Sequence, residues 1–234
     1  MITKISDKYF ETLGEPKPIA GFPSAIDKYR FYFIAKLVIG NSVLDIGAYF
    51  GDFLKVYALI NPHAELLATD INEKRVAIID RSLNRNVARV DFKNGELKTF
   101  QNKCVDTIVC TEVLEHVYDN EFAMTELMRV ARKRIIITVP FNEKIQQHLC
   151  LHCNQYTPPS GHLHEYQLNS FDKYQNDRWK ISCVNTFGNR VFNNMINKTG
   201  HRYIALSVDA VLKRILPSKN RWLLIILDNA ESIR

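Results

Sequence analysis

The residues best suited to bind a charged small molecule lie in the stretch Val43–Leu54. A short apolar run there includes Asp45, and two glycines follow at Gly47 and Gly51 with G-x-x-x-G spacing. This pattern predicts a buried strand, a sharp turn and the start of a helix, with backbone that can approach a ligand closely. Because a carboxylate at the strand end repels a pyrophosphate, Asp45 argues against a nicotinamide dinucleotide and favours a ligand that carries positive charge.

A second carboxylate follows the next predicted strand, which covers residues 65–69. Asp70 stands 19 positions after Gly51 (70 − 51 = 19). An acidic side chain at this place can accept hydrogen bonds from the hydroxyls of a ribose, and Ile71 would then pack on an adenine face. The alternative is an aspartate that caps the following helix, and the two roles are compatible.

Two further stretches come after the next strands. Asn94–Leu97 follows the expected third strand, and its Asn-Gly pair marks a turn with or without a ligand. The stretch Val105–Val117 contains the expected fourth strand and then Glu112, Glu115 and His116. The ordinary pKa of a histidine suits a general base near neutral pH, and a structural role for Glu115 and His116 is the alternative.

These four stretches, in this order, resemble the motifs of class I S-adenosylmethionine-dependent methyltransferases of the small-molecule type. The first motif of that family usually reads D-x-G-x-G-x-G, and Tyr49 replaces its middle glycine. The resemblance covers roughly residues 25–140 and implies S-adenosylmethionine as the cofactor. The implied cofactor-binding residues are Asp45, Gly47, Ala48, Tyr49, Gly51, Asp70, Ile71, Glu96, Leu97 and Thr111.

The same resemblance places Glu112, Glu115 and His116 at the mouth of the site, and these are the candidate catalytic residues. Methyl transfer is an in-line displacement, so positioning of the two reactants can supply much of the acceleration.

A second group of candidate ligands lies in the loop 141–168. Cys150 and Cys153 form a C-x-x-C pair, which places two thiolates within reach of one metal ion. His162 or His164, or both, could complete a tetrahedral zinc site. The loop resembles an insertion found after the fifth strand in some bacterial methyltransferases, although Asn154 stands where that insertion has glycine. The alternative is a reduced pair of surface cysteines beside histidines of a substrate loop.

Alternating strand and helix patterns predict the scaffold that positions these residues. We expect an α/β fold, namely a Rossmann-like, doubly wound, mostly parallel sheet of about seven strands with helices on both faces. The expected strands cover residues 43–46, 65–69, 89–92, 105–110, 134–139, 179–187 and 221–227, and the expected helices cover 25–38, 53–59, 73–83, 121–131 and pieces of 190–216. We expect one domain over 1–234, with an N-terminal segment and helix over 1–40, an inserted loop over 141–168 and a helical insertion over 188–218.

Composition narrows the class of protein. The chain has 234 residues, 46% hydrophobic and 24% charged, and a net charge of +6. No apolar run approaches the roughly 20 residues of a membrane span, and residues 1–10 lack the apolar core of a signal peptide, so we expect a cytoplasmic protein. Five cysteines, an odd number, argue against a disulfide framework.

The favoured function is therefore methyl transfer to an oxygen or nitrogen of a small, sugar-linked or lipid-linked acceptor. An RNA methyltransferase is an alternative, but the chain has no dense basic-aromatic block, so nucleic acid is not the expected partner. An inactive, methyltransferase-like interaction module is the other alternative, and Tyr49 in the glycine turn is its best support. The sequence leaves the oligomeric state open, including a homodimer.

Overall fold

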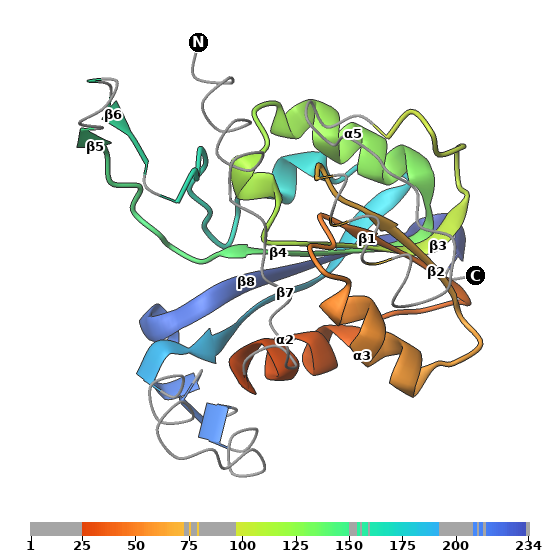
Figure 1. The fold of residues 1–234 in the computed structure, drawn as a ribbon, viewed down its shortest axis with the longest axis horizontal. Coiled ribbons are helices and arrows are strands. Elements are labelled where there is room, and N and C mark those ends of the chain that lie inside the picture. The colour runs from red at the N-terminus through yellow and green to blue at the C-terminus, as the bar shows by residue number, and fades with distance from the viewer. Residues whose placement is uncertain are drawn as a thin grey trace.

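The computed structural model describes residues 25–72, 75, 79, 97–149, 154, 156–158, 160–191, 208–209, 211–212 and 214–232 (Figure 1). Several predictions fall wholly or mostly outside this part of the chain. They are the N-terminal segment 1–24, the helix 73–83, the strand 89–92 and most of the helical insertion 188–218.

Six strands form one mixed sheet in the order β2-β1-β3-β4-β8-β7. Neighbouring strands among the first four pair in parallel, whereas β8 is antiparallel to both β4 and β7. This arrangement confirms the predicted Rossmann-like, mostly parallel sheet. The strands are β1 (Ser42–Ile46), β2 (Glu65–Thr69), β3 (Val105–Thr111), β4 (Ala131–Pro140), β7 (Trp179–Asn189) and β8 (Asn220–Asn229).

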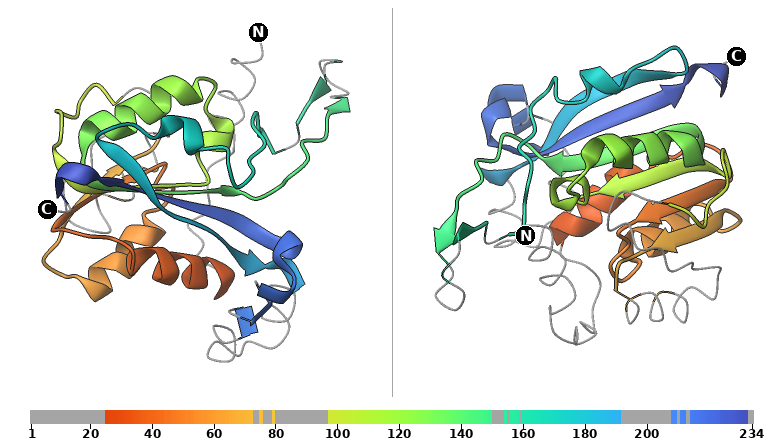
Figure 2. Two further views of the ribbon diagram at one scale, coloured as in Figure 1. Left: turned by 180° about the vertical axis from the view of Figure 1, so that it is seen from behind. Right: turned by 90° about the horizontal axis from the view of Figure 1, so that it is seen from above.

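Helices cover both faces of this sheet, as predicted. Helices α2 (Ala25–Ala35) and α3 (Asp52–Ile60) lie on one face, and α5 (Asn120–Val130) lies on the other (Figures 1 and 2). The prediction that the first helix continues to Val38 is wrong, because a turn closes it when the Leu37 amide donates to the Ile34 carbonyl. Within the described residues, none of the helices has the length and apolar character needed to cross a bilayer.

The remaining elements are short. Strands β5 (His148–Leu149) and β6 (Tyr156–Thr157) form a separate antiparallel pair, which extends away from the main sheet (Figure 1). The inserted loop therefore contains some regular structure. Single turns of 3-10 helix are η1 (Leu114–His116), η2 (Asp172–Tyr174), η3 (Pro217–Lys219) and η4 (Ala230–Ser232).

The core consists of two apolar layers, one on each face of the sheet. Ile135 and Ile137 of β4 pack in the layer beneath α5, whereas Ile136 between them packs in the layer beneath α2 and α3. Successive side chains of a strand point to opposite faces, and both faces are covered here. This double burial explains why the strands read as continuous apolar runs in the sequence.

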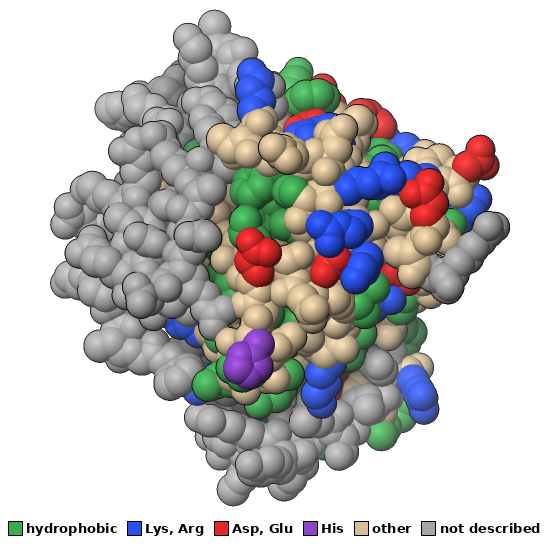
Figure 3. All heavy atoms as spheres, turned by 90° about the vertical axis from the view of Figure 1, so that its right-hand side faces the viewer, with side chains coloured by type: hydrophobic (Ala, Val, Ile, Leu, Met, Phe, Trp, Pro, Cys, Tyr) green, Lys and Arg blue, Asp and Glu red, His purple; other side chains and the backbone are tan. Residues whose placement is uncertain are grey.

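Charged side chains of both signs are interspersed on the face that Figure 3 shows, which is the right-hand side of Figure 1. On that face, the part of the chain that the structure describes presents no extended basic surface of the kind that nucleic-acid binding uses.

Asp106 lies in β3 and links the residue before β1 to the start of β4. Its carboxylate accepts a hydrogen bond of 2.8 Å from the Asn41 amide and pairs with Arg132 at 3.0 Å and Lys133 at 3.2 Å. Burial alone opposes ionisation, but these donors lower the pKa of Asp106 below its ordinary value.

We expect Asp106→Asn to lower the free energy of unfolding by about 1–3 kcal/mol at pH 7, because hydrogen bonds to a charged group are lost. A lowered pKa stabilises the protein above the ordinary aspartate pKa and loses that effect as the pH falls through the lower value. The deficit should therefore shrink in urea titrations repeated at about pH 3. Asp177→Asn, at an exposed position, is the matched control. An equal deficit at both pH values would contradict this account.

Candidate active site

The turn after β1 has three residues in the left-handed backbone region. Gly47, Tyr49 and Gly51 have φ of 66°, 54° and 71°. Tyr49 therefore adopts a conformation that favours glycine, at the position where the motif has its middle glycine. The Ala48 amide donates to the Thr69 carbonyl at 2.8 Å, which fastens the turn to the end of β2. The departure from the motif thus leaves a sharp turn in place.

The two predicted carboxylates lie at the ends of adjacent parallel strands, and both are buried. Asp45 and Asp70 are 3% and 4% exposed. Burial raises the pKa of Asp45 well above its ordinary value, the Arg30 charge opposes this, and the Asp70 charge adds to it. Neither carboxylate is turned outward into water. Two acids facing water would have excluded a shared binding role.

Asp70 holds the turn as well as the edge of the sheet. Its two oxygens accept hydrogen bonds from the Tyr49 and Asn72 amides, both at 2.9 Å. Arg75 lies 3.7 Å from the same carboxylate. Burial raises the pKa of Asp70, and these three partners oppose the increase. Asp70 is therefore fastened both to the turn after β1 and to the segment that follows β2.

The Tyr49 ring does not fill the turn. It is 47% exposed and makes an edge contact with Phe50 at 4.3 Å between ring centroids. The Arg75 guanidinium lies 4.4 Å from the centre of the Tyr49 ring, a cation–π contact. Arg75 was not among the predicted site residues, because its contact with the turn depends on how the chain folds back after β2.

Substitutions at Tyr49 should report the cost of its backbone conformation. The left-handed region costs a non-glycine residue about 1–2 kcal/mol. We therefore expect Tyr49→Gly to be more stable than Tyr49→Ala by about 1 kcal/mol, although both lose the contact with Arg75. Urea unfolding of the two variants measures the difference. An alanine variant as stable as the glycine variant would show that the turn relaxes to another conformation.

Glu112 directly follows β3 and connects its end to β4 and β8. Its φ is 56°, and its carboxylate accepts hydrogen bonds from the Thr138 hydroxyl at 3.2 Å and the Trp222 indole N–H at 3.1 Å. Burial raises the pKa of Glu112, and the Arg30 charge opposes this increase. Glu112 is thus held rigidly at the carboxyl end of the sheet.

Glu115 and His116 form the 3-10 turn η1 directly after it. The His116 Nε2 atom lies 4.0 Å from the Glu115 carboxylate, and the His116 Nδ1 atom lies 3.2 Å from the Gly161 carbonyl oxygen. Burial lowers the pKa of His116 to about 4, so its imidazole is neutral at physiological pH.

The two predicted histidines of the inserted loop have different partners. His162 Nδ1 lies 2.5 Å from the Glu143 carboxylate, and the His162 ring is 4.8 Å from the His116 ring between centroids. His164 Nε2 lies 2.7 Å from the Val117 carbonyl oxygen. Thus the structure brings His162 to the candidate catalytic residues. The predicted ligands Cys150 and Cys153 lie outside the described residues.

The other predicted cofactor residues are distributed between the strand ends and the core. Ile71 and Thr111 are partly exposed. Ile71 lies just beyond the end of β2, and Thr111 is the last residue of β3. Leu97 is fully buried, and its amide donates to the Glu126 carboxylate at 2.9 Å. That amide is therefore engaged with α5 rather than directed at a ligand. Glu96 lies outside the described residues.

Arg30 of α2 is a site residue that the sequence patterns did not single out. Its charge acts on Asp45, Glu112 and Glu115, in each case lowering a pKa that burial raises. Its guanidinium lies 5.4 Å from the centre of the Trp222 ring. The sequence signal that could have identified Arg30 is a positive charge on the otherwise largely apolar face of the predicted helix.

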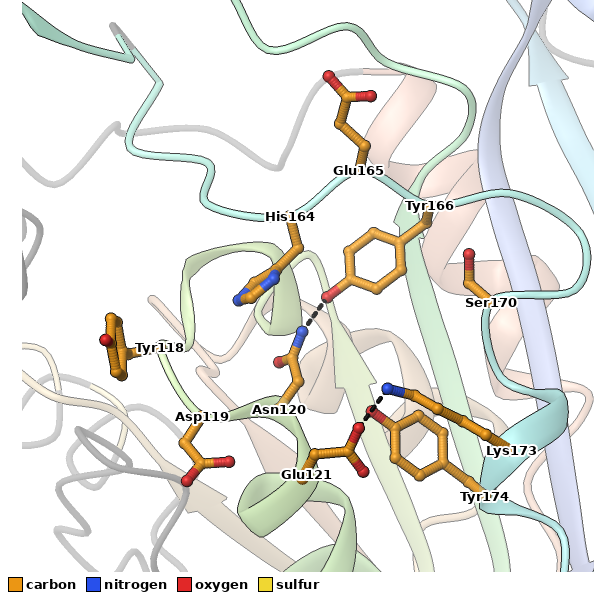
Figure 4. Close-up of a pocket in the computed structure, with 10 residues that line it drawn as sticks. All are labelled: Tyr118, Asp119, Asn120, Glu121, His164, Glu165, Tyr166, Ser170, Lys173 and Tyr174. Atoms are coloured by element: carbon orange, nitrogen blue, oxygen red, sulfur yellow. Dashed lines mark hydrogen bonds and ion pairs between the residues drawn. The ribbon is translucent and has the colours of Figure 1, made fainter.

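A cavity of about 380 Å³ opens beyond η1, between the start of α5 and the segment 164–174 (Figure 4). Asn120 donates to the Tyr166 hydroxyl at 2.6 Å inside it. The walls combine aromatic rings with polar and charged groups. They are formed by Tyr118, Asp119, Asn120, Glu121, His164, Glu165, Tyr166, Ser170, Lys173 and Tyr174.

Residues 44–137 match the family model described as a methyltransferase domain. Curated relatives include the ubiquinone/menaquinone biosynthesis C-methyltransferase UbiE of Xylella fastidiosa, strains M23 and Temecula1. Each is 30% identical over 111 residues, which cover 44% of this chain and 44% of the relative. The chain thus matches less than half the length of these relatives.

Solved structures extend the likeness to most of the fold. The methyltransferase from Archaeoglobus fulgidus has a TM-score of 0.57 at 18% identity, covering 87% of this chain and 93% of its own. The methyltransferase from Aquifex aeolicus has a TM-score of 0.54 at 15% identity, with coverages of 98% and 99%. The [4+2]-cyclase SpnF has a TM-score of 0.59 at 13% identity, with coverages of 86% and 81%. The chain therefore has the Rossmann-like fold of S-adenosylmethionine-dependent methyltransferases, and its residues 44–137 are similar in sequence to methyltransferase domains.

Proposed function

We propose that this protein transfers a methyl group from S-adenosylmethionine to a small-molecule acceptor. The observation that carries the proposal is the pair of buried carboxylates, Asp45 and Asp70, at adjacent strand ends around a turn of left-handed residues. A buried carboxylate favours a cationic ligand, and S-adenosylmethionine carries an ammonium and a sulfonium group. Because the same fold also occurs in a protein named as a cyclase, the fold alone does not decide the activity.

The remaining cofactor assignments are part of this proposal. Gly47, Ala48, Tyr49 and Gly51 would let the backbone approach the cofactor closely. Ile71, Glu96, Leu97 and Thr111 would line the adenosine side and the sulfonium side of the site. The Leu97 amide donates to Glu126, so residues next to Leu97 in the chain would have to make the contact with the cofactor.

His116 is the proposed general base, with Glu112 and Glu115 as positioning groups. A neutral imidazole can accept a proton, but burial lowers the pKa of His116 to about 4, so His116 is a weaker base in this structure than its ordinary pKa predicts. The hydrogen bonds of Glu112 to Thr138 and Trp222 would hold the end of β3 while the acceptor is aligned.

The acceptor is proposed to offer an oxygen or nitrogen atom and to be a small, sugar-linked or lipid-linked molecule. The cavity in Figure 4 supports a small polar acceptor, because its walls offer hydroxyl, amide and carboxylate groups. The curated relatives are named as C-methyltransferases, so a carbon acceptor is the competing assignment. The products of a transfer reaction with isotopically labelled methyl donor would separate the two.

Titration calorimetry with S-adenosylmethionine and with its demethylated product tests the proposal. We expect both ligands to bind, since the adenosine and amino-acid portions are common to them. An absence of binding at millimolar ligand, with circular dichroism showing a folded protein, would overturn it. That outcome would favour the non-enzymatic interaction module.

A structural zinc ion held by Cys150, Cys153, His162 and His164 remains a further proposal. Two thiolates and imidazole nitrogens form a ligand set that zinc prefers. Native mass spectrometry of the intact chain would report bound zinc, bound cofactor and the number of subunits, and so would also decide whether the chain forms a homodimer.

A further inference from the structure

We propose that Glu115, His116 and His162 form a binding site for a divalent cation beside the end of β3. One potential ligand atom from each residue lies within 4.8 Å of the other two. Two imidazole nitrogens and one carboxylate oxygen are a ligand set used by catalytic zinc sites and by non-haem iron sites. This site is distinct from the cysteine-based site predicted from the sequence, and it does not depend on the proposed methyl transfer. A bound ion would occupy the Nε2 lone pair of His116, so this site is an alternative to the proposed role of His116 as a general base.

The Glu115 carboxylate is the first reason to place a cation here. Glu115 is 1% exposed, and its Oε2 atom has no hydrogen-bond partner within the described part of the chain. A buried carboxylate oxygen without a partner is costly, because water no longer solvates it. A divalent cation would supply the missing partner.

The orientation of the two imidazoles is the second reason. His116 Nδ1 faces the Gly161 carbonyl at 3.2 Å, and His162 Nδ1 faces the Glu143 carboxylate at 2.5 Å. An acceptor beside Nδ1 draws the proton to that nitrogen, so the lone pair of each neutral ring is on Nε2. Metal-binding histidines use this arrangement, in which the acceptor fixes both the tautomer and the ring direction.

The backbone holds these side chains on two segments that are far apart in the sequence. Glu115 and His116 belong to η1, whereas His162 belongs to the inserted loop. The Leu163 amide donates to the Glu115 carbonyl at 2.6 Å, and His164 contacts the Val117 carbonyl at 2.7 Å. These contacts, made by the two residues directly after His162, preorganise the site, and three protein ligands leave positions open for water or a substrate oxygen.

The two proposed metal sites compete for His162. Its Nδ1 atom is engaged by Glu143, so Nε2 is the nitrogen available for a metal, and one lone pair serves one ion. A single experiment can therefore separate the two sites by the kind of ligand that surrounds the ion.

The test is a titration of the metal-stripped full-length chain with Co²⁺, and then with Zn²⁺, in the absence of S-adenosylmethionine. We expect one equivalent to bind and the Co²⁺ spectrum to lack the thiolate-to-cobalt charge-transfer band. Glu115→Gln and His162→Ala should each weaken binding by more than about tenfold, and Glu143→Gln should weaken it by about 10- to 100-fold. Glu65→Gln and His148→Ala, both at exposed positions, are the matched controls and should bind like the unmodified protein.

Three results would overturn the proposal: no binding of either ion, unchanged binding by folded Glu115→Gln, or a strong thiolate band that Cys150→Ser and Cys153→Ser abolish. If His162→Ala fails to fold by circular dichroism, His162→Gln keeps the side-chain volume closer and decides the same question. Because the titration contains no cofactor, a failure to bind S-adenosylmethionine leaves this result interpretable.

Discussion

Replacing Asp70 with alanine should lower the affinity for S-adenosylmethionine roughly ten- to a hundredfold, equivalent to ~1–3 kcal/mol. The carboxylate would accept hydrogen bonds from the ribose hydroxyls in the proposed complex. It also accepts a hydrogen bond from the Tyr49 amide in the turn, and it lies 3.7 Å from the Arg75 guanidinium. The alanine variant therefore loses both a ligand contact and the support of the turn. Titration calorimetry measures the change in dissociation constant.

Two further variants separate these contributions. Asp70→Asn retains a carbonyl oxygen for one amide but loses the charge that attracts Arg75, so it should weaken binding less than alanine does. Asp177→Asn is the surface control and should bind the cofactor normally. Unfolding in urea, followed for each variant, corrects for loss of structure. Equal affinity of Asp70→Ala and the unmodified protein would remove Asp70 from the proposed site.

Trp222→Ala should lower the free energy of unfolding by about 3–5 kcal/mol, the usual cost of removing a large buried ring. Trp222 is 1% exposed and packs against Phe187 at 5.2 Å between ring centroids. It also donates its indole N–H to Glu112 at the end of β3. The substitution therefore opens a cavity and leaves the Glu112 carboxylate with one partner fewer. Since typical domains are stable by only about 5–15 kcal/mol, urea unfolding will detect this readily.

Trp222→Phe keeps most of the ring and loses the hydrogen bond, so we expect a smaller loss of about 1–3 kcal/mol. Tyr32→Ala, on the exposed side of α2, removes an aromatic ring without opening the core and should change stability by less than about 0.5 kcal/mol. If the phenylalanine variant were as unstable as the alanine variant, the hydrogen bond to Glu112 would outweigh the packing.

The order of elements could be predicted because the strands are buried on both faces. Residues 105–110 and 134–139 were expected as strands and lie within β3 and β4. The ends of these strands differ from the predicted ones because pairing with neighbours extends a strand beyond its apolar run, as in β4, which begins at Ala131. The first helix was predicted too long because Leu37 and Val38 continue an apolar pattern that a backbone turn interrupts.

Local sequence determined the positions of the site residues that lie in a strand or in the turn directly after it. Asp45 lies near the end of β1, Gly47 follows β1 and Asp70 follows β2, and parallel strands bring their carboxyl ends to one edge of the sheet. The left-handed backbone of Tyr49 is a property of the short turn after β1, whereas the burial of the two acids depends on the packed sheet. The motif order therefore sufficed to identify the fold and this edge of the sheet.

Tertiary structure alone decided which side chains surround that edge. Arg30 approaches from α2, and His162 approaches from a loop that returns to η1 through backbone contacts with Glu115. No spacing in the sequence distinguishes His162 from His164, because each is placed by a different carbonyl or carboxylate partner. Contacts between segments so far apart form only when the whole chain has folded around its two core layers. A local pattern of residue types does not encode these contacts.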